Sequence, residues 1–264
     1  MIQIQGLNKT FTVPERASGL KETVRSVFKR QTRAIHAVRD LSFSVRPGEM
    51  VGYIGPNGAG KSTTIKIMSG ILVPDSGTCD ILGRTPWKQR KEHVRHIGVV
   101  FGQRSQLWWD VPVQDSFDLL RDIYRIGEKD YQVTLEQLTG VLDLGPLLQT
   151  PVRSLSLGQR MRCELAASLL HRPEILFLDE PTIGLDAVSK LAVRRFIREL
   201  NQEHGTTVIL TTHDMHDIDA LTRRILLIGQ GRILYDGSLD DLRSRYEETD
   251  LERLAVMLYQ EHQL

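Results

Sequence analysis

The chain is poor in cysteine and has no long apolar run. Cys79 and Cys163 are its only cysteines, too few for a disulfide framework or a tetrahedral metal site, and this usage is typical of a reducing compartment. The longest apolar runs, such as 175–178, fall far short of the roughly 18 residues that a membrane span needs. The first residues lack the charged-then-apolar order of a signal peptide. These absences predict a soluble, intracellular protein.

Neither sign of charge dominates the sequence. The chain has 34 Lys and Arg against 33 Asp and Glu, a net charge of +1, which points to no polyanionic partner, so no nucleic acid is expected. Hydrophobic residues make up 41% and charged residues 25%, ordinary values that exclude a disordered or fibrous protein. With 264 residues, the chain is long enough to bury a core in one large or two small domains.

Apolar runs indicate an α/β fold. Their hydrophobicity is continuous rather than alternating, which predicts strands covered on both faces, hence a mainly parallel sheet between helices. Residues 62–69 have a helical pattern that Gly70 is placed to end. Residues 114–170 indicate successive helices, broken near Gly127, Gly145 and Pro151, and so an inserted helical segment. The expected strands are 2–4, 41–45, 50–54, 97–101, 175–178, 207–210 and 225–228.

A glycine-rich segment follows the expected strand 50–54 and opens the helix after it. Its pattern is that of a phosphate-binding loop, G-x-x-x-x-G-K-[ST]. Glycines let successive backbone N–H groups point at phosphate oxygens, and the helix adds the positive end of its dipole. Lys61 would reach the β- and γ-phosphates, and the Ser62 hydroxyl would bind Mg²⁺. A glycine-rich turn with a solvated lysine is the alternative, which the strand–loop–helix context disfavours. The residues expected to bind nucleotide here are Gly55, Pro56, Asn57, Gly58, Ala59, Gly60, Lys61, Ser62 and Thr63.

Two carboxylates end the apolar strand at 175–178. Ligands collect at the carboxyl ends of strands in open α/β sheets, where the phosphate loop also lies. Asp179 would hold Mg²⁺, directly or through water. Glu180 would orient or deprotonate the attacking water. Without a phosphate loop such a pair is usually a solvated turn, and with one the functional interpretation is favoured.

A third motif makes the resemblance specific. The segment Leu155-Ser156-Leu157-Gly158-Gln159, with the two motifs above, closely resembles the L-S-G-G-Q signature of ATP-binding-cassette (ABC) ATPases, with Leu157 in place of the first glycine of the pair. The resemblance implies that Ser156, Gly158 and Gln159 bind nucleotide. Further matches occur in the family's order along nearly the whole chain. They are Phe11 as the aromatic that stacks on adenine, Gln103 as the metal-binding Q-loop glutamine, Asp186 in the D-loop (181–186), and His213 as the switch histidine.

The resemblance also implies an architecture and a mode of action. The expected fold is a P-loop NTPase core with a mainly parallel sheet, an N-terminal antiparallel β portion and a helical subdomain at about 104–172, all in a single ABC ATPase domain over 1–264. Two copies would close head to tail around two ATP and Mg²⁺, as a homodimer or a heterodimer with a related ATPase. Glu180, His213, Gln103 and Lys61 would carry catalysis. The partner would be a separate ABC-2-type permease, mostly an exporter, with the ATPase peripheral on the cytoplasmic side of the membrane.

Three segments leave alternatives open. Trp108 and Trp109 would anchor a permease helix or fill the core of the helical subdomain. Residues 12–35 carry six basic and two acidic side chains, and a predicted amphipathic helix at 20–28 would contact an anionic membrane surface or the permease through 15–32, or else pack on its own domain. The tail 238–264 is charged and predicted to be helical.

Two rival functions also remain. A soluble ABC ATPase acting on ribosomes would usually have two cassettes, and one acting on DNA would carry coiled coils or zinc modules. This sequence has one phosphate loop and one signature segment. A regulator that binds ATP but barely hydrolyses it is disfavoured by the presence of Glu180 and His213.

Overall fold

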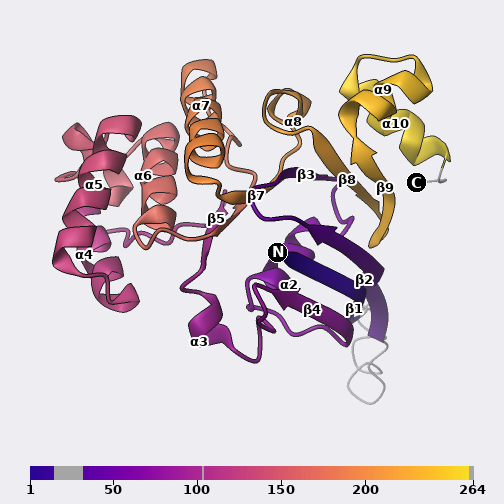
Figure 1. Ribbon diagram of the computed structural model, residues 1–264, viewed down its shortest axis with the longest axis horizontal. Helices are drawn as coiled ribbons and strands as arrows, with labels where there is room; N and C mark the ends of the chain where they lie inside the picture. The colour runs from indigo at the N-terminus through magenta and orange to yellow at the C-terminus, as the bar shows by residue number, and fades with distance from the viewer. Residues whose placement is uncertain (15–31, 103, 262–264) are drawn as a thin grey trace, which may run out of the picture.

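Two β-sheets form the framework of the chain, and helices flank them (Figure 1). The structure is a computed structural model that describes residues 1–14, 32–102 and 104–261. Together the two sheets form the α/β fold that was predicted, in which the three-stranded sheet is the N-terminal antiparallel portion. The strands are β1 (Ile2–Pro14), β2 (Thr32–Val45), β3 (Met50–Ile54), β4 (Ser76–Ile81), β5 (Ile97–Phe101), β6 (Ile175–Asp179), β7 (Thr207–Thr211), β8 (Arg224–Gly229) and β9 (Arg232–Ser238).

The six-stranded sheet is mainly parallel, as predicted. Its order is β5-β6-β7-β3-β8-β9, and only the β8–β9 pair is antiparallel. Successive side chains point to opposite faces, so each strand supplies two apolar cores. In β6, Leu176 and Leu178 face the core that the helical segment shares, whereas Ile175 and Phe177 face the core shared with the second sheet. Burial on both faces explains the continuous apolar runs in the sequence.

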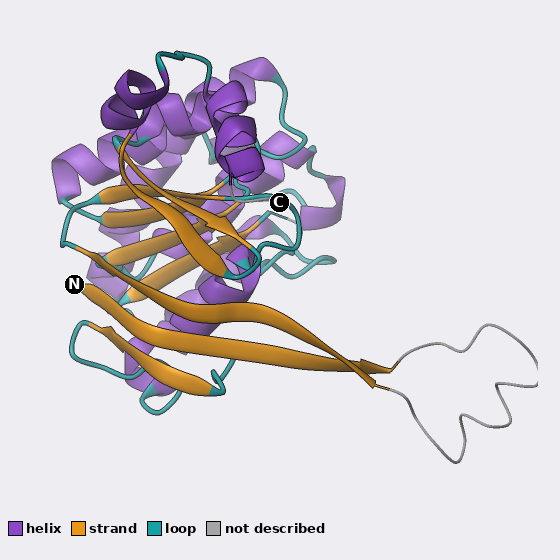
Figure 2. Cartoon of the chain, turned by 90° about the vertical axis from the view of Figure 1, so that its right-hand side faces the viewer, coloured by secondary structure: helices purple, strands orange, loops and turns teal. Residues whose placement is uncertain are grey.

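The three-stranded antiparallel sheet has the order β2-β1-β4. The sequence predicted only short strands at 2–4 and 41–45, but the β1–β2 ladder continues from the Ile2–Val45 pair to the Pro14–Thr32 pair. Figure 2 shows these two strands running out beyond the rest of the chain. Residues 12–14 and 32–35, the two ends of the expected insertion, therefore pair as strands. The helix expected at 20–28 lies outside the described residues.

The helical segment between β5 and β6 lies to one side of the parallel sheet (Figure 1). Its breaks fall where the sequence placed them, because Gly127 is the N-cap of the second helix and Pro146 lies in a 3-10 turn. Phe117, Leu138 and Leu165 join its helices in one core. The helices are α2 (Lys61–Met68), α3 (Arg90–His93), α4 (Val113–Tyr124), α5 (Glu128–Leu142), α6 (Leu157–Leu169), α7 (Ala187–His204), α8 (Met215–Leu221), α9 (Leu239–Tyr246) and α10 (Leu251–Glu261), with 3-10 turns at Gly145–Leu147 and Val152–Ser154.

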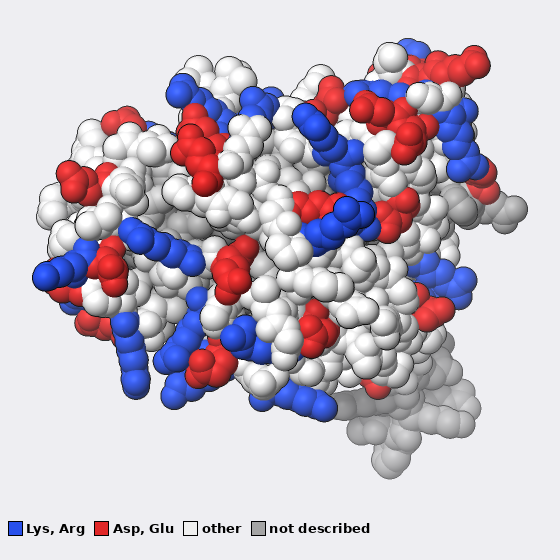
Figure 3. Space-filling view, in the orientation of Figure 1, with Lys and Arg blue, Asp and Glu red and all other residues white. Residues whose placement is uncertain are grey.

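Surface and thiol chemistry follow from this packing. Lys and Arg side chains alternate with Asp and Glu side chains over the face drawn in Figure 3. Burial raises the pKa of both the Cys79 and the Cys163 thiol to about 12, and the two side chains are free and buried. Among the residues that the structure describes, no helix has the length and apolar character to cross a bilayer.

Candidate nucleotide site

The predicted site residues lie at the carboxyl edge of the parallel sheet. Because β6, β7 and β3 are adjacent and parallel, the segments that follow them emerge side by side. These segments are the phosphate loop (55–62), the carboxylates Asp179 and Glu180, and the switch segment that contains His213. The topology thus brings the phosphate loop together with two motifs that lie more than a hundred residues further along the chain.

The phosphate loop depends on glycine at its last turn. Gly60, the N-cap of α2, has φ 105°, a left-handed conformation that L side chains rarely adopt. A Cβ at this position would lie 2.2 Å from the Ala37 carbonyl oxygen of β2. In the described part of the chain no side chain caps α2, so its first N–H groups keep their capacity to bind an anion.

Lys61 lies along the inside of the loop and is 6% exposed. Its Nζ donates to the Gly55 carbonyl oxygen at 2.6 Å and to the Pro56 carbonyl oxygen at 3.1 Å. Burial lowers the pKa of this ammonium, and the charges of Glu180 and Asp179 partly oppose that effect. A cation held by carbonyl oxygens alone is well placed to exchange those bonds for phosphate oxygens.

The two carboxylates after β6 have separate partners. Thr211 of the neighbouring strand donates its hydroxyl to Asp179 Oδ1 at 2.5 Å. Glu180 has φ 57°, which is uncommon outside glycine, and its N–H donates to the Thr211 carbonyl oxygen. Its Oε1 lies 2.6 Å from His213 Nε2. Thus Glu180 and His213 form a contact pair beside the phosphate loop, and Asp179 is turned to a different partner.

The signature segment (155–159) opens α6 with a reciprocal capping box. The Gln159 N–H donates to Ser156 Oγ, and the Ser156 N–H donates to Gln159 Oε1 at 2.8 Å. Gly158 is required by close packing, because a Cβ there would lie 2.6 Å from Ser189 Oγ of α7. Asp186 caps α7 by accepting from Ser189, and these hydrogen bonds lower the pKa of Asp186. The starts of α6 and α7 therefore lie in contact.

The remaining predicted residues have different surroundings. Phe11 is partly exposed on β1, and Lys9 Nζ lies 5.8 Å from its ring centroid. Gln103 lies outside the described residues. Trp108 and Trp109 are 42% and 52% exposed, so the alternative that they fill the core of the helical segment is wrong.

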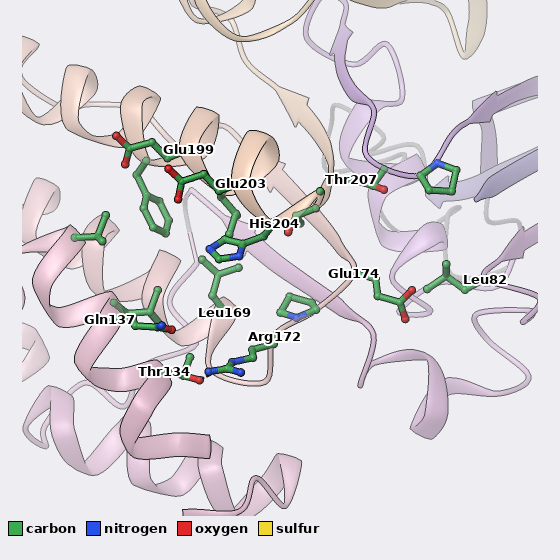
Figure 4. Close-up of a pocket in the computed structure, with 18 of the residues that line it drawn as sticks. Leu82, Thr134, Gln137, Leu169, Arg172, Glu174, Glu199, Glu203, His204 and Thr207 are labelled. Carbon is green, nitrogen blue, oxygen red and sulfur yellow. Dashed lines mark hydrogen bonds between the residues drawn. The ribbon is translucent and has the colours of Figure 1, made fainter. Parts of the chain in front are cut away.

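A separate cavity of about 790 Å³ lies at the amino end of β6 and β7, between α5 and α7 (Figure 4). Leu138 and Phe196 line its apolar side, while Glu203 and His204 contribute polar groups. None of the residues that line it belongs to the motifs found in the sequence. The carboxyl edge, rather than this cavity, is the site that the sequence predicts.

Sequence reasoning missed the polar residues behind the Glu180–His213 pair. The buried Asp217 of α8 accepts hydrogen bonds from Thr182, Thr212 and Arg194. These partners come from three segments, so no local pattern links them. The one available signal was a threonine near each predicted catalytic residue: Thr182 lies two positions after Glu180, and Thr212 directly precedes His213.

Comparisons with known proteins agree with this geometry. The family model described as "ABC transporter" matches residues 38–183. NatA, an ABC transporter ATP-binding protein of Bacillus subtilis (strain 168), is 30% identical over 85% of this chain and 91% of its own length. The daunorubicin resistance ATP-binding protein DrrA3 of Streptomyces coeruleorubidus is 34% identical over 86% of this chain and 71% of its own.

A solved ATP-binding subunit of an ABC transporter has a similar fold, with a TM-score of 0.80 at 24% identity over 97% of this chain and 98% of that one. The chain belongs to the ABC transporter family, as an ATP-binding-cassette ATPase. The resemblance to that family and the predicted fold class are thereby confirmed. The roles of individual residues stay predictions.

Proposed function

We propose that the chain is the ATP-hydrolysing subunit of an exporter whose permease is a separate ABC-2-type membrane protein. The observation that carries the ATPase part is the Glu180–His213 contact at 2.6 Å. His213 follows β7, the strand next to β3, which leads into the phosphate loop. Export is supported by relatives named for drug resistance, DrrA3 and the linearmycin resistance ATP-binding protein LnrL of Bacillus subtilis (strain 168). The subunit would be peripheral, on the cytoplasmic side of the membrane.

The triphosphate would lie across the phosphate loop. Its oxygens would accept from the uncapped N–H groups at the start of α2 and from Lys61 Nζ. The adenine would stack on the exposed face of Phe11. Ser62 and Asp179 supply hard oxygen ligands of the kind that Mg²⁺ prefers, and Gln103 is predicted as a third ligand. When bound, Mg²⁺ would neutralise charge on the phosphate oxygens.

Glu180 would accept a proton from the attacking water. Its carboxylate contacts His213, whereas Asp179 accepts from Thr211, so Glu180 would stay outside the metal ligand set. His213 would hydrogen-bond the γ-phosphate and hold Glu180 in place. Hydrolysis would then depend on an intact triphosphate that orders the pair.

The signature segment would complete the site of a second copy. Ser156 is exposed at the end of α6, where the helix N-terminus favours an anion. Two copies facing head to tail would each cover the γ-phosphate bound by the other, as a homodimer or with a related ATPase. A structural neighbour with a TM-score of 0.75 at 24% identity, covering 90% of this chain, is a dimeric ATP-binding cassette, MJ0796, in a post-hydrolysis state bound to ADP and Pi.

The exposed Trp108 and Trp109 would be anchors for a cytoplasmic helix of the permease. Large aromatic side chains that lie on the surface of a helical segment are typical of binding hot spots. The basic residues of 15–32 would add contact with the permease or with an anionic membrane surface.

Substitution of the base tests the ATPase part. Glu180→Gln should lower the ATP hydrolysis rate by about 100-fold or more, because removing a general base typically costs 10²–10⁴-fold, while ATP still binds and the ATP-bound dimer accumulates. Phosphate release and size-exclusion chromatography measure the two effects. Glu203→Gln, the same change at the opposite end of the sheet, is the control. Hydrolysis by Glu180→Gln at the parent rate would show that Glu180 is not the base.

Binding is tested separately at the phosphate loop. Lys61→Ala should weaken ATP affinity, because it removes the buried ammonium from the loop. A titration with ATP measures this affinity. An unchanged affinity would contradict the assigned role of Lys61.

A further inference from the structure

One carboxylate, Asp217, is completely buried behind the Glu180–His213 pair. Asp217 has 0% exposure in α8, and its Oδ1 accepts from Arg194 Nε of α7 at 2.5 Å. Its Oδ2 accepts from Thr212 Oγ1 at 3.1 Å and also from Thr182 Oγ1. Both carboxylate oxygens therefore accept hydrogen bonds from protein groups, and neither is exposed to solvent.

Such a buried charge is stable only when it is paired and hydrogen-bonded. Desolvating a carboxylate costs several kcal/mol, and removing one partner of a buried pair is strongly destabilising. Arg194 supplies the compensating charge and is itself largely buried, with 16% exposure. It also reaches Asp214 Oδ2 at 3.4 Å, which Lys190 binds at 2.6 Å. The network is therefore a rigid connection between α7 and α8.

The two threonines join this connection to the predicted catalytic pair. Thr182 follows Glu180 by two residues, and Thr212 directly precedes His213. Both hydroxyls bind the same Asp217 oxygen, so they fix the separation of the segments that carry Glu180 and His213. Glu180 needs such an external constraint, because its left-handed backbone conformation persists only where the surroundings impose it.

We propose that Asp217 is a positioning residue for ATP hydrolysis, which clamps the Glu180 and His213 segments through Thr182 and Thr212. The inference rests on the proposed catalytic role of Glu180. Neither Asp217 nor the two threonines touches nucleotide. Their effect is on the alignment of Glu180 with the attacking water, and therefore on turnover rather than on ATP binding.

The sharpest variant is Thr182→Val, which removes one clamp bond but keeps the Asp217–Arg194 pair. It should lower kcat by about tenfold to 100-fold, because misplacement of a catalytic group by about 1 Å has effects of this size. The KM for ATP should stay within about twofold, since the phosphate loop is untouched. Thr182→Ser keeps the hydroxyl and should recover most of the kcat. Asp217→Asn should resemble Thr182→Val in kcat, and circular dichroism checks that both variants fold.

Matched controls separate positioning from general damage. Asp219→Asn changes a carboxylate of the same helix that is paired with Arg243 at the surface, and its kcat should equal that of the parent. Adding Thr182→Val to Glu180→Gln should lower the residual rate by less than about twofold, because residues that act as a unit are not additive.

The outcomes distinguish this inference from the proposed function. If Glu180→Gln hydrolyses ATP at the parent rate, the assignment of Glu180 fails. If Glu180→Gln is inactive but Thr182→Val keeps the parent kcat, only the clamp is wrong. The clamp is also overturned if Thr182→Ser is as slow as Thr182→Val, or if Thr182→Val loses kcat and ATP affinity equally.

Discussion

The N-termini of α2 and α6 are built for anions in different ways. Gly60 leads into α2 with no side-chain cap among the described residues, so the first N–H groups of that helix await a ligand. Ser156 and Gln159 cap α6 within the chain itself. Capping by side chains satisfies the N–H groups that an anion would otherwise bind.

The two halves of the proposed site therefore differ in how many of their N–H groups are free to bind an anion before ATP is present. The phosphate loop holds Lys61 and the free N–H groups in place before ATP arrives. In the signature segment the capping box already engages the Ser156 and Gln159 N–H groups. Its proposed contribution to a γ-phosphate would therefore come from the Ser156 hydroxyl proton and the N–H groups that follow it, or from a rearranged cap. We therefore expect ATP to bind first to the phosphate loop and the signature segment to follow on dimerisation.

The largest effect should come from the N-cap of α2. Gly60→Ala places a Cβ 2.2 Å from the Ala37 carbonyl oxygen at φ 105°, so the loop must move and ATP affinity should fall by about 100-fold, on the order of 3 kcal/mol. Isothermal titration measures the affinity.

Gly58→Ala is the matched control for this clash. Gly58 also has a positive φ, 80°, but an added Cβ would meet none of the described atoms within 4 Å. Gly58→Ala should therefore lose only the free energy that a left-handed alanine costs, about 1–2 kcal/mol. Equal losses of ATP affinity in the two variants would show that backbone strain, rather than the clash with Ala37, causes the loss.

A smaller effect is expected at the N-cap of α6. Ser156→Ala should leave ATP affinity of the single subunit unchanged while weakening the ATP-bound dimer of Glu180→Gln by about tenfold for each of its two sites, because one hydrogen bond to a charged group is worth about 1.5–3 kcal/mol. Analytical ultracentrifugation with ATP measures the dimer.

Loss of a cap alone would also lower stability, so a second cap is the control. Ser238 caps α9 by accepting from the Asp241 N–H at 3.0 Å. Ser238→Ala should lower the free energy of unfolding by about 1 kcal/mol, as loss of the Ser156 cap should. Its dimer should match the parent. If Ser156→Ala and Ser238→Ala weakened the dimer equally, the effect would come from loss of a helix cap and not from a contact of the signature segment with ATP.

The last prediction concerns folding stability rather than ATP binding, at the other end of α6. Burial lowers the pKa of His171, just past α6, to about 4, although a helix C-terminus favours a charged histidine. Below pH 6.5 the unfolded chain takes up a proton that the folded chain does not, so the free energy of unfolding falls as pH drops toward 4. The loss attributable to His171 should reach about 3 kcal/mol.

Urea unfolding of the parent and of His171→Gln at pH 7 and pH 4.5 measures this loss. Other titrating groups are shared by the two proteins and cancel in their difference. The parent should lose more stability than the variant on acidification. Parallel losses would mean that His171 is charged in the folded chain.

The sequence predicted the parallel strands and the phosphate loop because each has a strong local pattern. It did not predict β4 or β9, whose residues are mostly exposed or half-buried and so lack a continuous apolar run. The long β1–β2 ladder was hidden for the same reason, since its outer part, including Phe11 and Ile35, is exposed. Strand pairing of this kind depends on contacts between distant residues.

The predicted motifs named Glu180 and His213, but their contact and the left-handed conformation of Glu180 became visible only in the fold. The Asp217 network is harder still to predict from sequence. Thr182 and Asp217 are 35 residues apart, and a buried carboxylate has the same one-letter code as a solvated one. Local sequence thus indicates which groups carry the chemistry, whereas the groups that align them come from packing.

The burial of both native thiols has a practical consequence. At neutral pH neither Cys79 nor Cys163 presents a reactive thiolate to a maleimide reagent. A cysteine introduced at Val188, which is 76% exposed at the start of α7, would therefore take a fluorophore selectively in an otherwise unaltered chain. Energy transfer between two labelled copies would then test whether the subunits approach and separate during turnover, as the proposed dimer requires.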